Sequence, residues 1–109
     1  MESDVLEQLK SHFQQGNLAQ VEKMALEYLK VEPDHPLLNK MVGICLSQRQ
    51  DLQGAKERFT NALRAEPNDG DCLNNLGFCY LFTHDYLRAA DYFLQALSQA
   101  DKPEWQCNL

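Results

Sequence analysis

The chain has 109 residues, of which 44% are hydrophobic and 24% charged, and its formal net charge is −6. This length suits one domain, and the composition is that of an ordinary globular chain. The acidic balance, without a basic stripe, excludes nucleic acid and an anionic membrane surface as expected partners.

The chain ends and the cysteines indicate the compartment. Residues 1–4 include two acids and no apolar run follows them, so we expect no signal peptide. Cys72 and Cys79 lie seven residues apart, which is about 10 Å along a helix axis and too far for a disulfide. We therefore expect Cys45, Cys72, Cys79 and Cys107 to be free thiols in a reducing, cytoplasmic compartment.

Apolar residues recur with helical spacing along most of the chain. Gly16-Asn17 and two Pro-containing turns, 33–36 and 67–70, separate the periodic segments. Helices are predicted over residues 3 or 4 to 15, 18–31, 36–49, 52–65, 70–83 and 86–100, followed by a short helical stub at 104–109.

Polar residues before these segments are expected to cap the helices. Asn17, with Gln20 three residues later, predicts a capping box for the second helix. Asp51 and Asp85 are predicted to cap the fourth and sixth helices. Pro36 is compatible with the first turn of the third.

The stretch 73–82 is apolar on two sides of one helix. Leu73, Leu76 and Tyr80 follow the i, i+3, i+7 spacing of a core-facing side, whereas Phe78 and Phe82 fall on a different side. A helix that is apolar on two sides is covered on both. One cover is the protein itself, and the other is either a partner or a second part of the same protein.

The same stretch belongs to an internal repeat of 34 residues. Identical residues recur at this spacing in the pairs Gly43/Gly77, Pro33/Pro67, Ala55/Ala89, Phe59/Phe93, Ala62/Ala96 and Leu63/Leu97. The period, with Leu-Gly-x-x-Tyr, then Ala-x-x-x-Phe, then Pro, resembles the tetratricopeptide (TPR) repeat, a helix–turn–helix unit. The resemblance implies one all-α domain over 1–109, a solenoid of six antiparallel helices in repeats 2–35, 36–69 and 70–103.

The repeat positions predict how the helices pack. Gly43 is expected to face Ala55, and Gly77 to face Ala89, with Phe59 and Phe93 filling the wider space beyond. In the first repeat the residue sizes are exchanged, since Leu9 stands in the glycine position and Ala25 in the phenylalanine position. Cores tolerate such an exchange of volume.

Catalytic and metal sites find no support in the sequence. His12, His35 and His84 are scattered, and core packing is the simpler interpretation of His12. There is no nucleophile elbow, no Cys-x-x-Cys and no His-x-x-x-His pair. We expect a non-enzymatic protein without metal or cofactor.

Proteins of the TPR family are interaction scaffolds whose first helices line a concave groove. The resemblance therefore implies a peptide-binding groove with apolar residues and polar handles. The candidate groove residues are Leu6, Lys10, Phe13, Leu37, Lys40, Ile44, Asn74, Asn75, Phe78, Leu81 and Phe82.

The known two-carboxylate clamp of TPR proteins, which binds the tails of heat-shock chaperones, does not fit this groove. It needs a Lys in the first repeat, where Leu6 stands. It needs bases in the third, where Asp71 and Asn75 stand. An apolar peptide or helix is the expected ligand instead.

Three alternatives remain open. The third repeat is similar to type III secretion translocator chaperones, which predicts a chaperone for a secreted protein. An accessory module of a larger enzyme or assembly is another possibility. The last helix, with Tyr92, Leu94 and Leu97 expected on its outer side and only the Trp105 stub to cover it, also predicts a homodimer through the C-terminal end.

Overall fold

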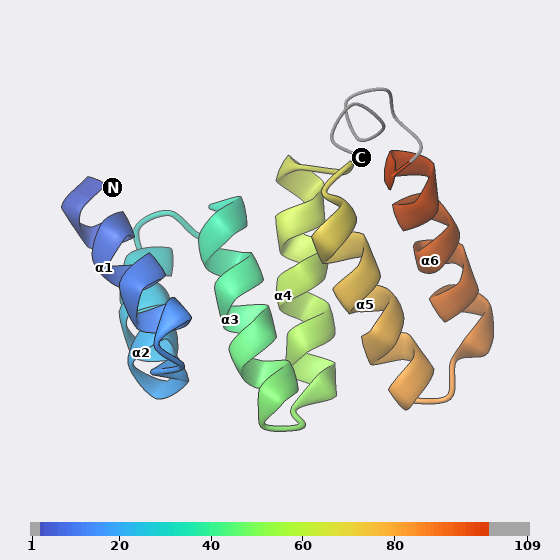
Figure 1. Ribbon diagram of the computed structural model, residues 1–109, viewed down its shortest axis with the longest axis horizontal. Coiled ribbons are helices and arrows are strands. Elements are labelled where there is room, and N and C mark those ends of the chain that lie inside the picture. The colour runs from blue at the N-terminus through green and yellow to red at the C-terminus, as the bar shows by residue number, and fades with distance from the viewer. Residues whose placement is uncertain (1–2, 101–109) are drawn as a thin grey trace.

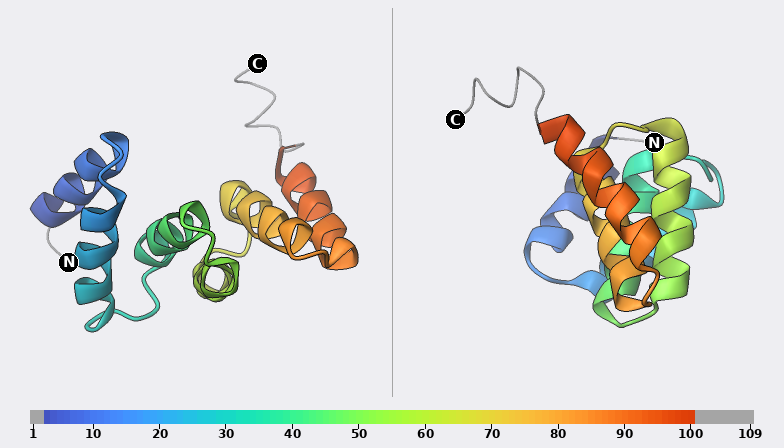
Figure 2. Two further views of the ribbon diagram at one scale, coloured as in Figure 1. Left: turned by 90° about the horizontal axis from the view of Figure 1, so that it is seen from below. Right: turned by 90° about the vertical axis from the view of Figure 1, so that its right-hand side faces the viewer.

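The computed structural model describes residues 3–100, which form six helices in three antiparallel pairs. The pairs follow one another in a row, with α1 and α6 at opposite ends (Figures 1 and 2). Residues 3–100 contain no strand, so the predicted all-α fold is confirmed. The stub with Trp105 lies outside the described residues, as does Cys107. The helices are α1 (Ser3–Gln14), α2 (Leu18–Leu29), α3 (Pro36–Gln48), α4 (Leu52–Ala65), α5 (Gly70–Phe82) and α6 (Tyr86–Ala100).

The helix boundaries follow the sequence pattern closely, with one clear exception. Helices α4 and α6 have the predicted bounds, but α2 ends at Leu29 rather than at residue 31. The backbone N–H of Lys30 donates to the carbonyl oxygen of Glu27 (3.3 Å), and the N–H groups of Val31 and Glu32 donate to that of Tyr28 (3.1 and 3.0 Å), which closes the helix. Val31 lies beyond this end and is 79% exposed, so it contributes nothing to the core.

The predicted caps are confirmed for two helices and wrong for one. Asp51 accepts from the Gly54 N–H (3.1 Å), and Asp85 accepts from the Arg88 N–H (3.3 Å). The Asn17 side chain makes no capping hydrogen bond. Its amide lies 3.3 Å from His12 Nδ1 and donates to Gln15 Oε1 (3.2 Å), so polar groups around the preceding turn compete successfully for it.

The turn inside each helix pair has the same backbone conformation. Gly16 (φ 79°), Gln50 (φ 70°) and His84 (φ 65°) all lie in the left-handed region, and they are spaced by the 34-residue repeat. Only Gly16 adopts this conformation without a steric penalty. The 34-residue repeat is therefore preserved in the backbone conformation of this turn, although the three residues are of different types.

The core of each of the last two helix pairs is a phenylalanine ring lying on a glycine. A Cβ added to Gly43 would lie 2.7 Å from Cε1 of Phe59, and one added to Gly77 would lie 2.7 Å from Cε1 of Phe93. The atoms nearest to each glycine thus belong to the ring, which the sequence analysis placed in the wider space beyond. In the first pair Leu9 and Ala25 are both fully buried, as expected for an exchange of volumes.

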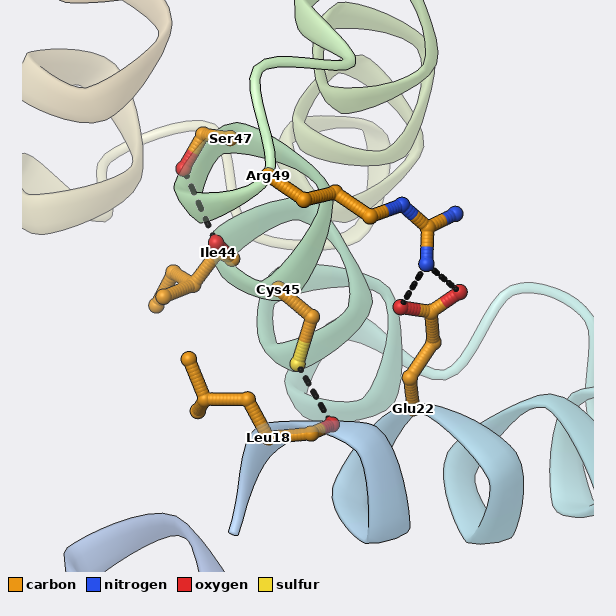
Figure 3. Close-up of polar contacts among 6 residues, drawn as sticks. All are labelled: Leu18, Glu22, Ile44, Cys45, Ser47 and Arg49. Carbon is orange, nitrogen blue, oxygen red and sulfur yellow. Dashed lines mark hydrogen bonds and ion pairs between the residues drawn. The ribbon is translucent and has the colours of Figure 1, made fainter. Parts of the chain in front are cut away.

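Cysteines lie at the seams between successive helix pairs. The Cys45 thiol donates to the carbonyl oxygen of Leu18 (3.4 Å). Beside it, Nη1 of Arg49 donates to both carboxylate oxygens of Glu22 (2.6 and 2.7 Å), as Figure 3 shows. The Cys72 thiol donates to the carbonyl oxygen of Phe59 (3.4 Å). Burial raises the pKa of Cys45 to about 11 and that of Cys72 to about 12. Cys45, Cys72 and Cys79 are free, as predicted.

The glycine–ring contacts predict a graded response to an added methyl group. Overpacking typically lowers the unfolding free energy by about 1–3 kcal/mol. Alanine has a higher helix propensity than glycine, which offsets about 1 kcal/mol of this loss. Gly43→Ala should destabilise the protein by up to about 2 kcal/mol. Gly77→Ala should cost less, because the Phe93 ring is only half-buried and can shift, whereas Phe59 is fully buried. Urea denaturation measures both.

Gly70→Ala is the matched control, because a Cβ there meets no atom closer than 3.8 Å. Its unfolding free energy should stay equal to that of the wild type or rise slightly. A Gly43→Ala protein as stable as Gly70→Ala would show that the ring does not hold the helices at this separation.

The cysteines predict that stability falls at alkaline pH. In the unfolded chain a thiol ionises near its ordinary pKa of 9.0, whereas native Cys45 keeps its proton to about pH 11 and Cys72 to about pH 12. At alkaline pH the native state therefore binds more protons than the unfolded state. The stabilisation that the two thiols contribute is fully present below about pH 9 and is lost between about pH 9 and 12. The urea midpoint should be lower at pH 10.5 than at pH 8. In Cys72→Ala the urea midpoint should decrease less between pH 8 and pH 10.5. An equal decrease would show that the Cys72 thiol does not contribute to this pH dependence.

Candidate functional site

The first helix of each pair contributes to one groove, called here the central groove. Its floor is apolar and comes from Phe13 on α1 and Leu37, Met41 and Ile44 on α3, while polar side chains stand along its edges. The hollow has a volume of about 400 Å³. It is lined by Lys10, Phe13, Leu37, Lys40, Met41, Ile44, Asp71, Asn74 and Asn75.

A second hollow, called here the aromatic pocket, adjoins the central groove at Asn75. It encloses about 240 Å³, and no charged residue lines it. The rings of Phe78 and Phe82 stack at a centroid distance of 6.2 Å and stay 43% and 63% exposed. The pocket is lined by Ser47, Gln48, Gln50, Leu52, Asn75, Phe78, Cys79 and Phe82.

A third hollow, called here the lateral pocket, lies between α5 and α6 on the other side of Phe78. It has a volume of about 530 Å³ and is lined by Gly70, Asp71, Asn74, Phe78, Leu81, Phe93, Ala96 and Leu97. It shares Asp71 and Asn74 with the central groove. Helix α5 thus contributes side chains to all three hollows.

The structure divides the predicted groove residues among these hollows. The central groove brings together Lys10, Phe13, Leu37, Lys40, Ile44, Asn74 and Asn75. Phe78 and Phe82 lie in the aromatic pocket, and Leu81 lies in the lateral pocket. Leu6 is half-buried on α1 and lines none of the three hollows.

Two predicted groove residues also have structural roles. Lys40 is not a free polar handle, since its Nζ donates to Asp69 Oδ2 at 2.9 Å. Burial alone lowers the pKa of Lys40, but the hydrogen bond and charge of Asp69 outweigh it and raise the pKa above its ordinary value. Phe78 packs edge-on against Phe93 with centroids 5.1 Å apart, so its ring also joins α5 to α6.

Asp69 caps the N-terminus of α5 and also holds Lys40 at the edge of the groove. Its Oδ1 accepts from the Cys72 N–H (3.2 Å) and caps α5, while Oδ2 holds Lys40 of α3. Sequence patterns gave no signal for this pairing, because the two residues lie 29 positions apart. The pocket-lining residues Ser47, Gln50 and Leu52 were also missed, since they belong to the end of α3 and to the turn and helix that follow rather than to the groove-facing positions of the first helices.

The described residues offer no metal or membrane feature. No cluster of three or more His, Cys, Asp or Glu side chains capable of holding a metal ion occurs in residues 3–100. Within the same part of the chain, every helix is too short or too polar to cross a membrane.

Sequence and structure comparisons identify the family. The family profile described as tetratricopeptide repeat matches residues 46–107, more than half of the chain. The chain belongs to the tetratricopeptide repeat family. No curated protein sequence matches it. TPR domains are protein-interaction modules, which agrees with the function expected from the sequence.

Solved structures show the same fold at low sequence identity. The second TPR of Spaghetti (RPAP3) bound to the HSP90 peptide SRMEEVD has a TM-score of 0.81 at 14% identity, covering 88% of this chain and 89% of that one. The TPR2B domain of yeast Sti1 in a pHsp70 complex has a TM-score of 0.81 at 14% identity, covering 94% and 82%.

A third similar structure belongs to a longer chain. MamA MSR-1 C2 has a TM-score of 0.78 at 15% identity, and the alignment covers 89% of this chain but only 56% of that one. At such identities these structures show the common TPR fold alone.

The double role of Asp69 predicts two separable effects on stability. Asp69→Ala removes the cap and the ion pair together and should cost about 1–2 kcal/mol of unfolding free energy. Asp69→Asn keeps a good capping side chain and loses only the charge opposite Lys40, so it should cost clearly less. Chemical denaturation measures both, and equal losses would show that the cap contributes nothing.

Proposed function

We propose that this TPR domain is a non-catalytic scaffold or adaptor that holds an apolar peptide segment or helix of another protein in its central groove and aromatic pocket. The observation that carries the proposal is the stacked pair Phe78 and Phe82, whose rings stay exposed beside an uncharged pocket. Exposed apolar patches of this kind mark partner surfaces. Aromatic side chains are the commonest anchors in such interfaces.

Polar groups around the apolar surface would fix the orientation of the ligand. The side chains of Asn74 and Asn75 line the groove and make no hydrogen bond within residues 3–100. Side-chain amides both donate and accept, so they can pair with the backbone of an extended segment. An apolar lining with few polar groups is typical of binding sites.

The ligand is proposed to differ from the peptides in the similar structures. The HSP90 peptide SRMEEVD of the Spaghetti complex is acidic. In the central groove Lys40 is already paired with Asp69, and Asp71 stands at the same edge. The groove therefore favours a segment with apolar anchors over a tail rich in carboxylates. The translocator-chaperone and enzyme-module alternatives remain predictions.

The outer face of α6 supports a second proposal, a homodimer through this helix. Leu87 and Leu94 are 84% and 64% exposed, in the positions that Gln53 and Thr60 occupy on α4, and Leu97 is 60% exposed. Tyr92, expected on the same face, instead stacks on Tyr80 at 5.5 Å. At the start of the same helix Arg88 pairs with Asp85 at 3.1 Å, so these two charges offset each other.

The free thiols agree with a reducing compartment. Three buried cysteines lie in residues 3–100, and none of them forms a disulfide. We propose the cytoplasm as the location.

Phe82 provides the clean test of the binding proposal. Peptides selected from a random dodecapeptide library should bind the wild-type protein and lose about 2 kcal/mol, roughly 30-fold in Kd, in Phe82→Ser. The unfolding free energy should change by less than about 1 kcal/mol, because Phe82 is 63% exposed and its ring stacks on Phe78, which is itself exposed. Calorimetric titration and thermal unfolding give the two values.

Val31→Ser is the matched control, since it removes an apolar side chain that is even more exposed than Phe82 (79% against 63%) and lines none of the three hollows. It should leave peptide binding unchanged. If Phe82→Ser binds as tightly as Val31→Ser, the aromatic pocket is not the ligand site. Phe78→Ser should lower both binding and stability, because Phe78 also contacts Phe93.

The dimer has its own test. Sedimentation of the wild type should show a monomer–dimer equilibrium that shifts with concentration, and Leu87→Glu/Leu94→Glu should abolish it. Val31→Glu, which adds a charge at an exposed apolar position elsewhere, should leave it intact. A wild type that stays monomeric at the highest soluble concentration would contradict the dimer.

A further inference from the structure

The two edges of the central groove carry opposite charges. On α1, Lys10 is exposed, and its Nζ makes no hydrogen bond or ion pair with any residue in 3–100. On the first turn of α5, Asp71 is also exposed and makes no hydrogen bond or ion pair within that range, although Lys40 lies near enough for the Asp71 charge to help raise its pKa. The remaining charges at this edge, Lys40 and Asp69, neutralise each other at 2.9 Å. One edge is therefore positive and the other negative.

An apolar floor separates the two charges. Phe13, Leu37 and Ile44 are half-buried and Met41 is buried, so a ligand that covers this floor removes water from the groove. A charge that loses water without gaining a partner destabilises the complex. A ligand with no counter-charges would meet this penalty at both edges, and one with reversed charges would in addition be repelled.

We propose that the segment bound in the central groove carries an acidic group, an apolar stretch and a basic group in that order across the groove, with the acid at Lys10 and the base at Asp71. The inference rests on the proposed function, and it adds the chemical class of the ligand and the direction in which it lies. The occupant is a segment of a partner protein with this charge pattern. Because complementary charges select orientation more than they add affinity, the pattern sets specificity.

The test uses random dodecapeptides displayed on phage and selected on the full chain. The wild type should enrich peptides with an apolar core flanked by an acid on one side and a base on the other, in one fixed order. The double variant Lys10→Glu/Asp71→Lys should enrich the opposite order. Its control, Lys23→Glu/Asp91→Lys, makes the same charge exchange at exposed positions on α2 and α6, and it should keep the wild-type order.

A synthetic peptide from the wild-type selection then tests the pairing with Lys10. Replacing its acid by Gln or Asn should weaken binding to the wild type about threefold to tenfold. The same replacement should have no effect on Lys10→Gln, because the partner charge is already absent.

The outcomes separate this inference from the proposed function. Two outcomes would overturn the charge pattern while the groove proposal stands. The enriched apolar peptides could have no fixed order of acid and base, or Lys10→Glu/Asp71→Lys could enrich the same order as the wild type. Enriched peptides whose binding is the same in Phe82→Ser and Phe78→Ser would overturn the groove proposal as well. Failure to enrich any peptide would count against both.

Discussion

The close approach of a glycine to a phenylalanine ring sets the geometry of this solenoid. Gly43 and Gly77 leave no room for a methyl group under Phe59 and Phe93. These contacts fix the distance between α3 and α4 and between α5 and α6. Interior packing resists changes of even one methylene. In the first pair Leu9 and Ala25 fill a comparable volume with the large and small residues exchanged. The first pair is packed less closely than the other two, yet α1, α3 and α5 all contribute side chains to the groove.

Helix α5 connects the groove to the rest of the fold. One side of it is buried by Leu73, Leu76 and Cys79, while Asn74, Asn75 and Phe78 on its other side line the hollows. Its first turn depends on Asp69, which is also the partner of Lys40. Asp69, a residue needed to start the helix, thus also neutralises the positive charge of Lys40 at this edge of the groove. Binding surface and structural support share the same few side chains.

The sequence predicted the features that depend on local spacing. The 34-residue period and the apolar periodicity were sufficient for all six helices, and polar residues at the helix starts were sufficient for the caps at Asp51 and Asp85. The candidate groove residues came from the resemblance to the TPR family, and most of them line the central groove. Contacts between distant residues could not be predicted in this way. Asn39 is fully buried because its amide bonds to the backbone of the preceding turn and to Arg58, and no pattern marks such a residue for the core. The charge pairing of Lys40 and the contact of Phe78 with Phe93 depend in the same way on tertiary packing.

The placement of the cysteines gives the fold a set of internal reporters. Cys45 lies at the junction of the first and second helix pairs, and Cys72 lies at the junction of the second and third. Repeat proteins can open at one junction while the others stay closed, because each unit contacts only its neighbours. Separation of the first pair would expose Cys45 alone, whereas separation of the third would expose Cys72. The order in which these two thiols become reactive therefore records the end from which the array comes apart.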